Sequence, residues 1–225
     1  MRNRVGLYFA TLSRLILETE VTDEAGHSLP LDQAFEKVAA AAHSVHDVGN
    51  TIMFIGNGGS AGLASHLAID FSKNGRLRSL AFNDASALTC LGNDLGYENV
   101  FAKQLEFHAR AGDLLIAISS SGQSANILAA VERARAAKVG VITLSGFGRD
   151  NKLRRTGDLN FYVRSSEYGF VEVAHLALCH AILDLDMGWA STMAAAQLDV
   201  RHNERDLQIL PRQGVNPAES PRALP

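Results

Sequence analysis

The spacing of hydrophobic positions changes about fifty residues into the chain. Before that point, apolar residues recur every three or four positions over residues 3–20 and 31–48, which predicts two amphipathic helices. After it come five short apolar runs that are rich in β-branched and aromatic residues, and amphipathic stretches of about 10–15 residues separate most of them. The runs cover residues 51–56, 79–83, 113–118, 139–145 and 159–163.

Short apolar strands that alternate with helices predict an α/β fold, in which helices cover both faces of a parallel sheet. We expect a single domain with a five-stranded parallel sheet and one late helix at about residues 170–188. Residues 1–48 would form N-terminal helices that pack on the domain and on partner subunits, and residues 49–189 would form the core. Residues 190–225 become Ala-rich and then polar, so we expect a flexible C-terminal tail.

The composition excludes several classes of protein. The chain has 225 residues, of which 47% are hydrophobic, and its formal net charge of -3 argues against a general nucleic-acid-binding protein. Cys90 and Cys179 both lie in apolar stretches, which indicates a reducing compartment and no disulfide framework. The N-terminus lacks the features of a signal peptide, and no segment has the roughly 18 consecutive apolar residues of a membrane span. A cytoplasmic protein without a membrane segment is therefore expected.

Two loops rich in Gly and Ser each follow a predicted strand and precede a predicted helix. The first is Gly-Asn-Gly-Gly-Ser at residues 56–60, and the second is Ser-Ser-Ser-Gly-Gln-Ser at residues 119–124. Glycine allows close backbone approach to a ligand, and free N–H groups at a helix start attract anions. Each loop alone is equally compatible with a tight turn and a helix cap. Together, at the carboxyl ends of parallel strands, they predict a phosphate-binding site.

Histidines and carboxylates on two predicted helices are candidates for chemistry. His66 and Asp70 are four residues apart, so they share a helix face and could bind a metal, transfer protons or simply form a hydrogen-bonded pair. Glu172 and His180 are two turns apart, about 12 Å along a helix. Both reach one metal only if the first turn is distorted or the site combines two chains. His175 points about 140° away from His180, so we interpret it as a packing residue or as a residue with a separate role.

Three segments resemble a known family. GNGGSAGLASH from residue 56, LTCLGNDLGYENVFAKQLE from residue 88 and GDLLIAISSSGQSANIL from residue 112 are similar to the phosphoheptose isomerases, which have the sugar isomerase (SIS) fold. The similarity extends over about residues 5–188. It implies a SIS-type phosphosugar-binding domain that interconverts a ketose phosphate, sedoheptulose 7-phosphate, and an aldose phosphate, D-glycero-D-manno-heptose 7-phosphate, through an enediol. It also implies a homotetramer.

The resemblance implies a role for each matching residue. The Ser-rich loop would bind the sugar phosphate, and Asp94 would face the sugar hydroxyls. His66 would bind a divalent metal ion, which is commonly zinc in the family, with one ion in each site. The implied substrate-binding residues are Asn57, Gly58, Gly59, Ser60, Asp94, Ser119, Ser120, Ser121, Ser124 and Glu172. The implied metal ligands are His66, Asp70, Glu172 and His180, and the implied proton-transfer residues are Asp70 and His180.

Three positions depart from the family pattern. The family's catalytic glutamate falls at Asp70, its glutamine ligand at Glu172, and a further sugar-contacting aspartate at Gly169. These departures leave an alternative open. The chain could be a non-catalytic SIS protein that binds phosphosugars or partner proteins and resembles the DnaA initiator-associating protein. In either case we expect a homo-oligomer, because the first helices carry more apolar surface than one sheet face needs.

Overall fold

The computed structural model describes residues 2–189 of the chain. These residues form a seven-stranded sheet with helices packed around it. The strand order is β2-β1-β7-β6-β5-β3-β4. The five expected strands are present and pair in parallel with one another. They are β3 (Ile52–Gly56), β4 (Ser79–Ala81), β5 (Leu114–Ser119), β6 (Gly140–Ser145) and β7 (Leu159–Tyr162). The expected tail, residues 190–225, lies outside the described residues.

The expectation of five strands is wrong by two, because the polar segment between the first two helices also joins the sheet. β1 (Glu20–Asp23) pairs antiparallel with β7, and β2 (Ser28–Leu29) pairs antiparallel with β1. In β1 only Val21 is buried, so the segment has no apolar run that a hydrophobic pattern could reveal. The turn of the hairpin is closed by Asp23, whose Oδ1 accepts the His27 N–H at 2.8 Å.

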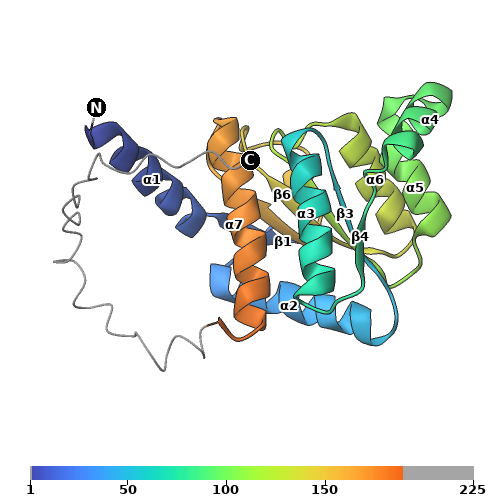
Figure 1. Cartoon of the computed structure of the whole chain (residues 1–225), viewed down its shortest axis with the longest axis horizontal. Coiled ribbons are helices and arrows are strands. Elements are labelled where there is room, and N and C mark those ends of the chain that lie inside the picture. The colour runs from blue at the N-terminus through green and yellow to red at the C-terminus, as the bar shows by residue number, and fades with distance from the viewer. Residues whose placement is uncertain (1, 190–225) are drawn as a thin grey trace, which may run out of the picture. The chain divides into compact units, whose positions relative to one another are not determined.

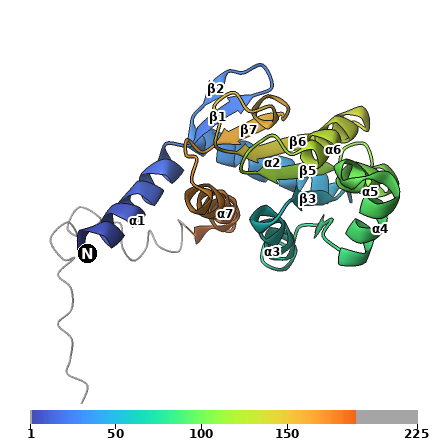
Figure 2. The same cartoon turned by 90° about the horizontal axis from the view of Figure 1, so that it is seen from above.

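Helices cover both faces of the sheet, as Figures 1 and 2 show. α2 (Leu31–Asp47), α3 (Gly59–Lys73) and α7 (Tyr168–Asp186) pack on one face, and α5 (Val100–His108) and α6 (Ala125–Ala136) pack on the other. Successive side chains along a strand point to opposite faces of the sheet, so each strand contacts both layers of helices. In β3, Ile52 and Phe54 contact the first group of helices, whereas Met53 and Ile55 contact the second. The near-continuous apolar strands follow from this double burial.

Two further helices lie away from the sheet. α1 (Arg2–Leu17) packs against the start of α7, where the Tyr8 and Phe170 rings have centroids 4.5 Å apart. α4 (Ala85–Leu95) follows β4, and its N-cap Asp84 accepts the Ala87 N–H at 2.8 Å. A 3-10 turn at Tyr97–Asn99 joins α4 to α5, and another at Leu153–Arg155 precedes β7.

One helix of the described residues, α7, is long and apolar enough to be considered as a membrane span. Its apolar side is used inside the protein, since Val171, Ala174, Leu178 and Ile182 are all buried in core clusters with the sheet and neighbouring helices. α7 also carries His175 within the core. We therefore interpret α7 as a core helix.

Candidate active site

The two Gly/Ser-rich loops meet at the carboxyl ends of neighbouring strands. β3 is paired with β5 along its whole length, with Gly56 opposite Ile118, so both loops leave the same edge of the sheet. Gly58 has φ +54°, a left-handed conformation that suits glycine, and it turns the chain from β3 into α3. Ser124 occupies the N-cap position of α6, and its side chain makes no capping hydrogen bond there. Two helix N-termini therefore point at the space between the loops.

A cavity of about 250 Å³ lies between the loops. It brings together nine of the ten residues that the sequence predicts to bind substrate. These lining residues are Asn57, Gly58, Gly59, Ser60, Ser119, Ser120, Ser121, Ser124 and Glu172. Tyr168, at the start of α7, also lines the cavity and was not predicted. Of the described residues that line it, Glu172 is the only charged one.

The serine hydroxyls of the second loop are arranged as donors with few competing partners. Ser119 Oγ and Ser124 Oγ are 3.3 Å apart, and the Gly122 N–H donates to Ser119 Oγ at 3.2 Å. Ser120 Oγ is buried without a hydrogen-bond partner among the described residues. A buried polar group left unpaired costs about 1–3 kcal/mol. An anion in the cavity would remove this cost, because its oxygens accept hydroxyl hydrogen bonds.

An asparagine that the sequence did not single out links the two loops. Asn126, on the first turn of α6, is 2% exposed. Its side-chain amide exchanges two hydrogen bonds with that of Asn57, at 2.8 and 2.9 Å. The Tyr97 hydroxyl also donates to Asn57 Oδ1 at 3.1 Å. The only sequence signal for Asn126 is its place two residues after Ser124, so its role required the folded structure.

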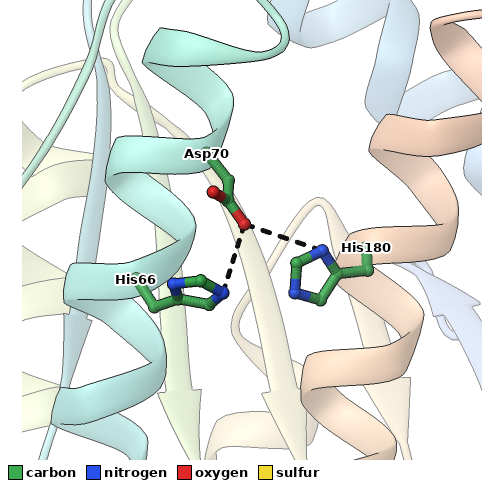
Figure 3. A group of neighbouring side chains, drawn as sticks. All are labelled: His66, Asp70 and His180. Carbon is green, nitrogen blue, oxygen red and sulfur yellow. Dashed lines mark ion pairs between the residues drawn. The ribbon is translucent and has the colours of Figure 1, made fainter.

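His66, Asp70 and His180 converge between α3 and α7, as Figure 3 shows. Asp70 Oδ2 lies 3.2 Å from His66 Nε2 and 3.7 Å from His180 Nδ1. One ligand atom from each residue lies within 4.8 Å of the other two. Ligands of a tetrahedral zinc ion with bonds of about 2.0–2.2 Å lie about 3.4 Å apart. Two nitrogens and an oxygen at these separations fit a zinc ion with an open position for a ligand.

Glu172 and Asp94 lie apart from this cluster. A Cβ atom at Gly59 would be 2.5 Å from both carboxylate oxygens of Glu172, so this side chain faces the first loop and the cavity. Within the described residues, Glu172 does not belong to the group of His66, Asp70 and His180 that could hold a metal, in keeping with its two-turn separation from His180. Asp94 lies on α4, exposed, where the neighbouring Asn93 Nδ2 donates to it at 2.8 Å. It does not line the cavity.

His175 is fully buried and separate from the cluster. Its Nε2–H donates to the Ser145 carbonyl at 3.1 Å, and its Nδ1 has no hydrogen-bond partner among the described residues. Burial lowers the pKa of His175 from 6.5 to about 4, because the charged imidazolium would lose its hydration. The residue is therefore a neutral part of the core at physiological pH.

Comparison with known proteins identifies the family. Residues 8–146 match the SIS domain family. The chain is 38% identical over 156 residues to a phosphoheptose isomerase of Akkermansia muciniphila, a match that covers 67% of this chain and 82% of the relative. A phosphoheptose isomerase of Rhodospirillum rubrum is 39% identical over 143 residues, which cover 61% and 76% of the two chains. The chain belongs to the phosphoheptose isomerase family.

The fold agrees with this assignment. A solved phosphoheptose isomerase of Neisseria gonorrhoeae aligns with a TM-score of 0.68 at 33% identity, over 82% of this chain and 98% of that one. The resemblance predicted from the loop motifs is thereby confirmed, and the chain is a phosphosugar isomerase of the aldose–ketose type. At Gly169, where the family pattern has an aspartate, a Cβ atom would lie 3.2 Å from the Tyr8 hydroxyl.

Proposed function

We propose that this isomerase interconverts sedoheptulose 7-phosphate and D-glycero-D-manno-heptose 7-phosphate in the cytoplasm. The observation that carries the proposal is the separation of two sites along α3. The anion cavity lies at Gly59 and the His/Asp cluster begins at His66, seven residues or about 10 Å along the helix. An open-chain sugar held by its phosphate in the cavity would extend its other end towards the cluster. The cysteines Cys90 and Cys179 are free thiols, which supports a reducing compartment.

Asp70 and His180 are the residues that we assign to proton transfer. A base removes the proton from the carbon next to the carbonyl, the electron pair forms an enediol, and an acid returns a proton to the neighbouring carbon. Asp70 is only 14% exposed in its side chain, and His180 comes from the opposite helix, so the two groups can face a substrate bound beside the pair. The reaction is redox-neutral and needs only proton transfer.

A zinc ion would be held by His66, Asp70 and His180, with Glu172 remaining at the phosphate cavity. When bound there, zinc would polarise the carbonyl and hydroxyl oxygens of the sugar. The chain's own residues anchor the phosphate through Ser119, Ser120, Ser121 and Ser124 and move the protons.

The direct test is incubation of the purified chain with sedoheptulose 7-phosphate. NMR is expected to show an aldose signal that grows in to equilibrium, and mass spectrometry of the native protein is expected to show bound zinc. Removing zinc with a chelator should lower the rate, and adding it back should restore it. No aldose product with or without zinc would overturn the proposed substrate.

We also propose that a homotetramer is the active form. α1 exposes large apolar side chains, namely Val5, Leu7, Phe9 and Leu17, each 61–72% exposed. Isolated monomers rarely leave so much apolar surface on one short helix in water. Sedimentation velocity is expected to give about four times the 24.2 kDa chain mass. Phe9→Glu should shift the distribution to smaller species, and a wild-type monomer would contradict the proposal.

A further inference from the structure

The loop between β6 and β7 stands directly behind the serine loop of the phosphate cavity. Two backbone hydrogen bonds join them. The Gly146 N–H donates to the Ser120 carbonyl at 3.0 Å, and the Leu153 N–H donates to the Gly122 carbonyl at 3.1 Å. We call residues 146–153 the backing loop. Any shift of the backing loop would therefore move the backbone that carries the cavity's serines.

Asn151 is the side chain that holds the backing loop in shape. It is 1% exposed. Its Nδ2 donates to the carbonyls of Gly146 and Gly148 at 3.1 and 2.9 Å, and lies 3.3 Å from Ser145 Oγ. Its Oδ1 accepts the Arg154 N–H at 3.0 Å. One buried amide thus satisfies groups at both ends of the loop, and its removal would leave several of them unpaired.

The same side chain supports the centre of the serine loop. Gly122 has φ +60°, and a Cβ atom there would collide with Asn151 Oδ1, so the two residues are in tight contact. The Gly122 N–H in turn donates to both the carbonyl and the hydroxyl of Ser119. The position of Asn151 therefore sets the position of Gly122, and through it the direction of the Ser119 hydroxyl.

We propose that Asn151 is a positioning residue that sets the affinity of the phosphate cavity. This inference rests on the proposed role of that cavity in binding the sugar phosphate. The hydrogen bonds of Asn151 within the described residues involve neither α3 nor α7, which carry the His/Asp cluster. Phosphate contacts are equally strong in the bound substrate and in the transition state. Loosening them therefore raises KM and leaves kcat almost unchanged.

Asn151→Ala is the variant that tests this role. We expect KM for the sugar phosphate to rise about tenfold or more, kcat to stay within about twofold, and zinc content to be unchanged. The dissociation constant of inorganic phosphate, measured by calorimetry, is expected to rise in parallel. An unchanged phosphate affinity in a folded Asn151→Ala protein would overturn the proposal.

Asn160→Ala is the matched control. Asn160 is also 1% exposed and also makes buried hydrogen bonds, accepting from Thr143 Oγ1 and the Gly157 N–H, each at 2.8 Å. It lies in β7 and bonds to the turn before that strand, away from the serine loop. Its replacement should lower stability without raising KM. An equal rise in KM for both variants would reduce Asn151 to a general structural role and contradict the proposal.

Gly122→Ala provides a second route if Asn151→Ala does not fold. The added methyl group is directed at Asn151 Oδ1, so phosphate affinity should fall as it does in Asn151→Ala. In the double variant the Asn151 amide, which gives the closest approaches, is gone, and only the Cβ of residue 151 at 2.9 Å and the strain of φ +60° remain. The two losses should therefore be less than multiplicative. Independent, fully multiplicative losses would overturn the coupling. Because phosphate binding is measured without turnover, this test stands even if sedoheptulose 7-phosphate proves not to be the substrate.

Discussion

His180→Asn is expected to lower kcat for sugar phosphate isomerisation by about a thousandfold, with a much smaller effect on KM. His180 Nδ1 lies 3.7 Å from Asp70 Oδ2, and the rings of His180 and His66 have centroids 5.3 Å apart, so its imidazole belongs to the His/Asp cluster to which we assign proton transfer. Asparagine keeps a polar side chain but cannot exchange protons near neutral pH. The phosphate cavity, two helical turns away, should remain intact. Steady-state kinetics measures both constants.

His43→Asn is a matched control on a different helix pair that also includes α7. His43 Nε2 lies 2.8 Å from Asp186 Oδ2, so it too is a histidine paired with an aspartate, between α2 and α7. It lines neither the cavity nor the cluster, and its replacement should leave kcat unchanged. If His180→Asn kept more than about a tenth of the wild-type kcat, the proton-transfer site would have to lie elsewhere. Zinc content of the variant then separates loss of a ligand from loss of an acid or base.

The strands show which part of the fold a sequence can predict. β3, β5 and almost all of β6 are buried, so each reads as a continuous apolar run, and all were predicted within a residue or two. β1 and β2 have polar sequences. They join the edge of the sheet because β1 pairs with β7 and β2 pairs with β1. Their stability is tertiary in origin, since β1 contributes only Val21 to the core. A hydrophobic pattern cannot detect such strands.

The site divides in the same way. Each of the two loops that line the cavity is one short segment that follows a recognisable strand. The sequence therefore predicted that the two loops meet at one edge of the sheet. Asn126 and Asn151 act through residues far along the chain, the first on Asn57 and the second on Gly122. Asn151 stands between Asp150 and Lys152, in a segment that reads as an exposed polar turn. Its burial follows from the packing of two loops, which local sequence does not encode.

Helical spacing gave a partial answer for Glu172. A two-turn separation from His180 indicated that one straight helix does not bring both to the same metal. The helix is indeed continuous, and Glu172 faces Gly59 while His180 faces Asp70. Spacing measures distance along one helix, but it does not say which loop lies opposite each turn. That information comes from the packing of α7 on α3.

The buried His175 is expected to make stability depend on pH. Its pKa is 6.5 when exposed in the unfolded chain and about 4 in the fold, where burial disfavours the charge. Between these values the unfolded state binds more protons, so stability is full above pH 6.5 and declines as the pH falls towards 4. The loss is about 2 kcal/mol at pH 5 and about 3 kcal/mol at pH 4. Urea unfolding at fixed protein concentration measures it.

His175→Gln isolates this contribution, because glutamine can still donate to the Ser145 carbonyl but does not titrate in this range. The variant should be less stable than wild type at pH 7.5, through imperfect packing, yet lose about 2 kcal/mol less between pH 7.5 and 5. Parallel slopes for wild type and His175→Gln would mean that the buried imidazole takes up a proton without unfolding, which its complete burial argues against.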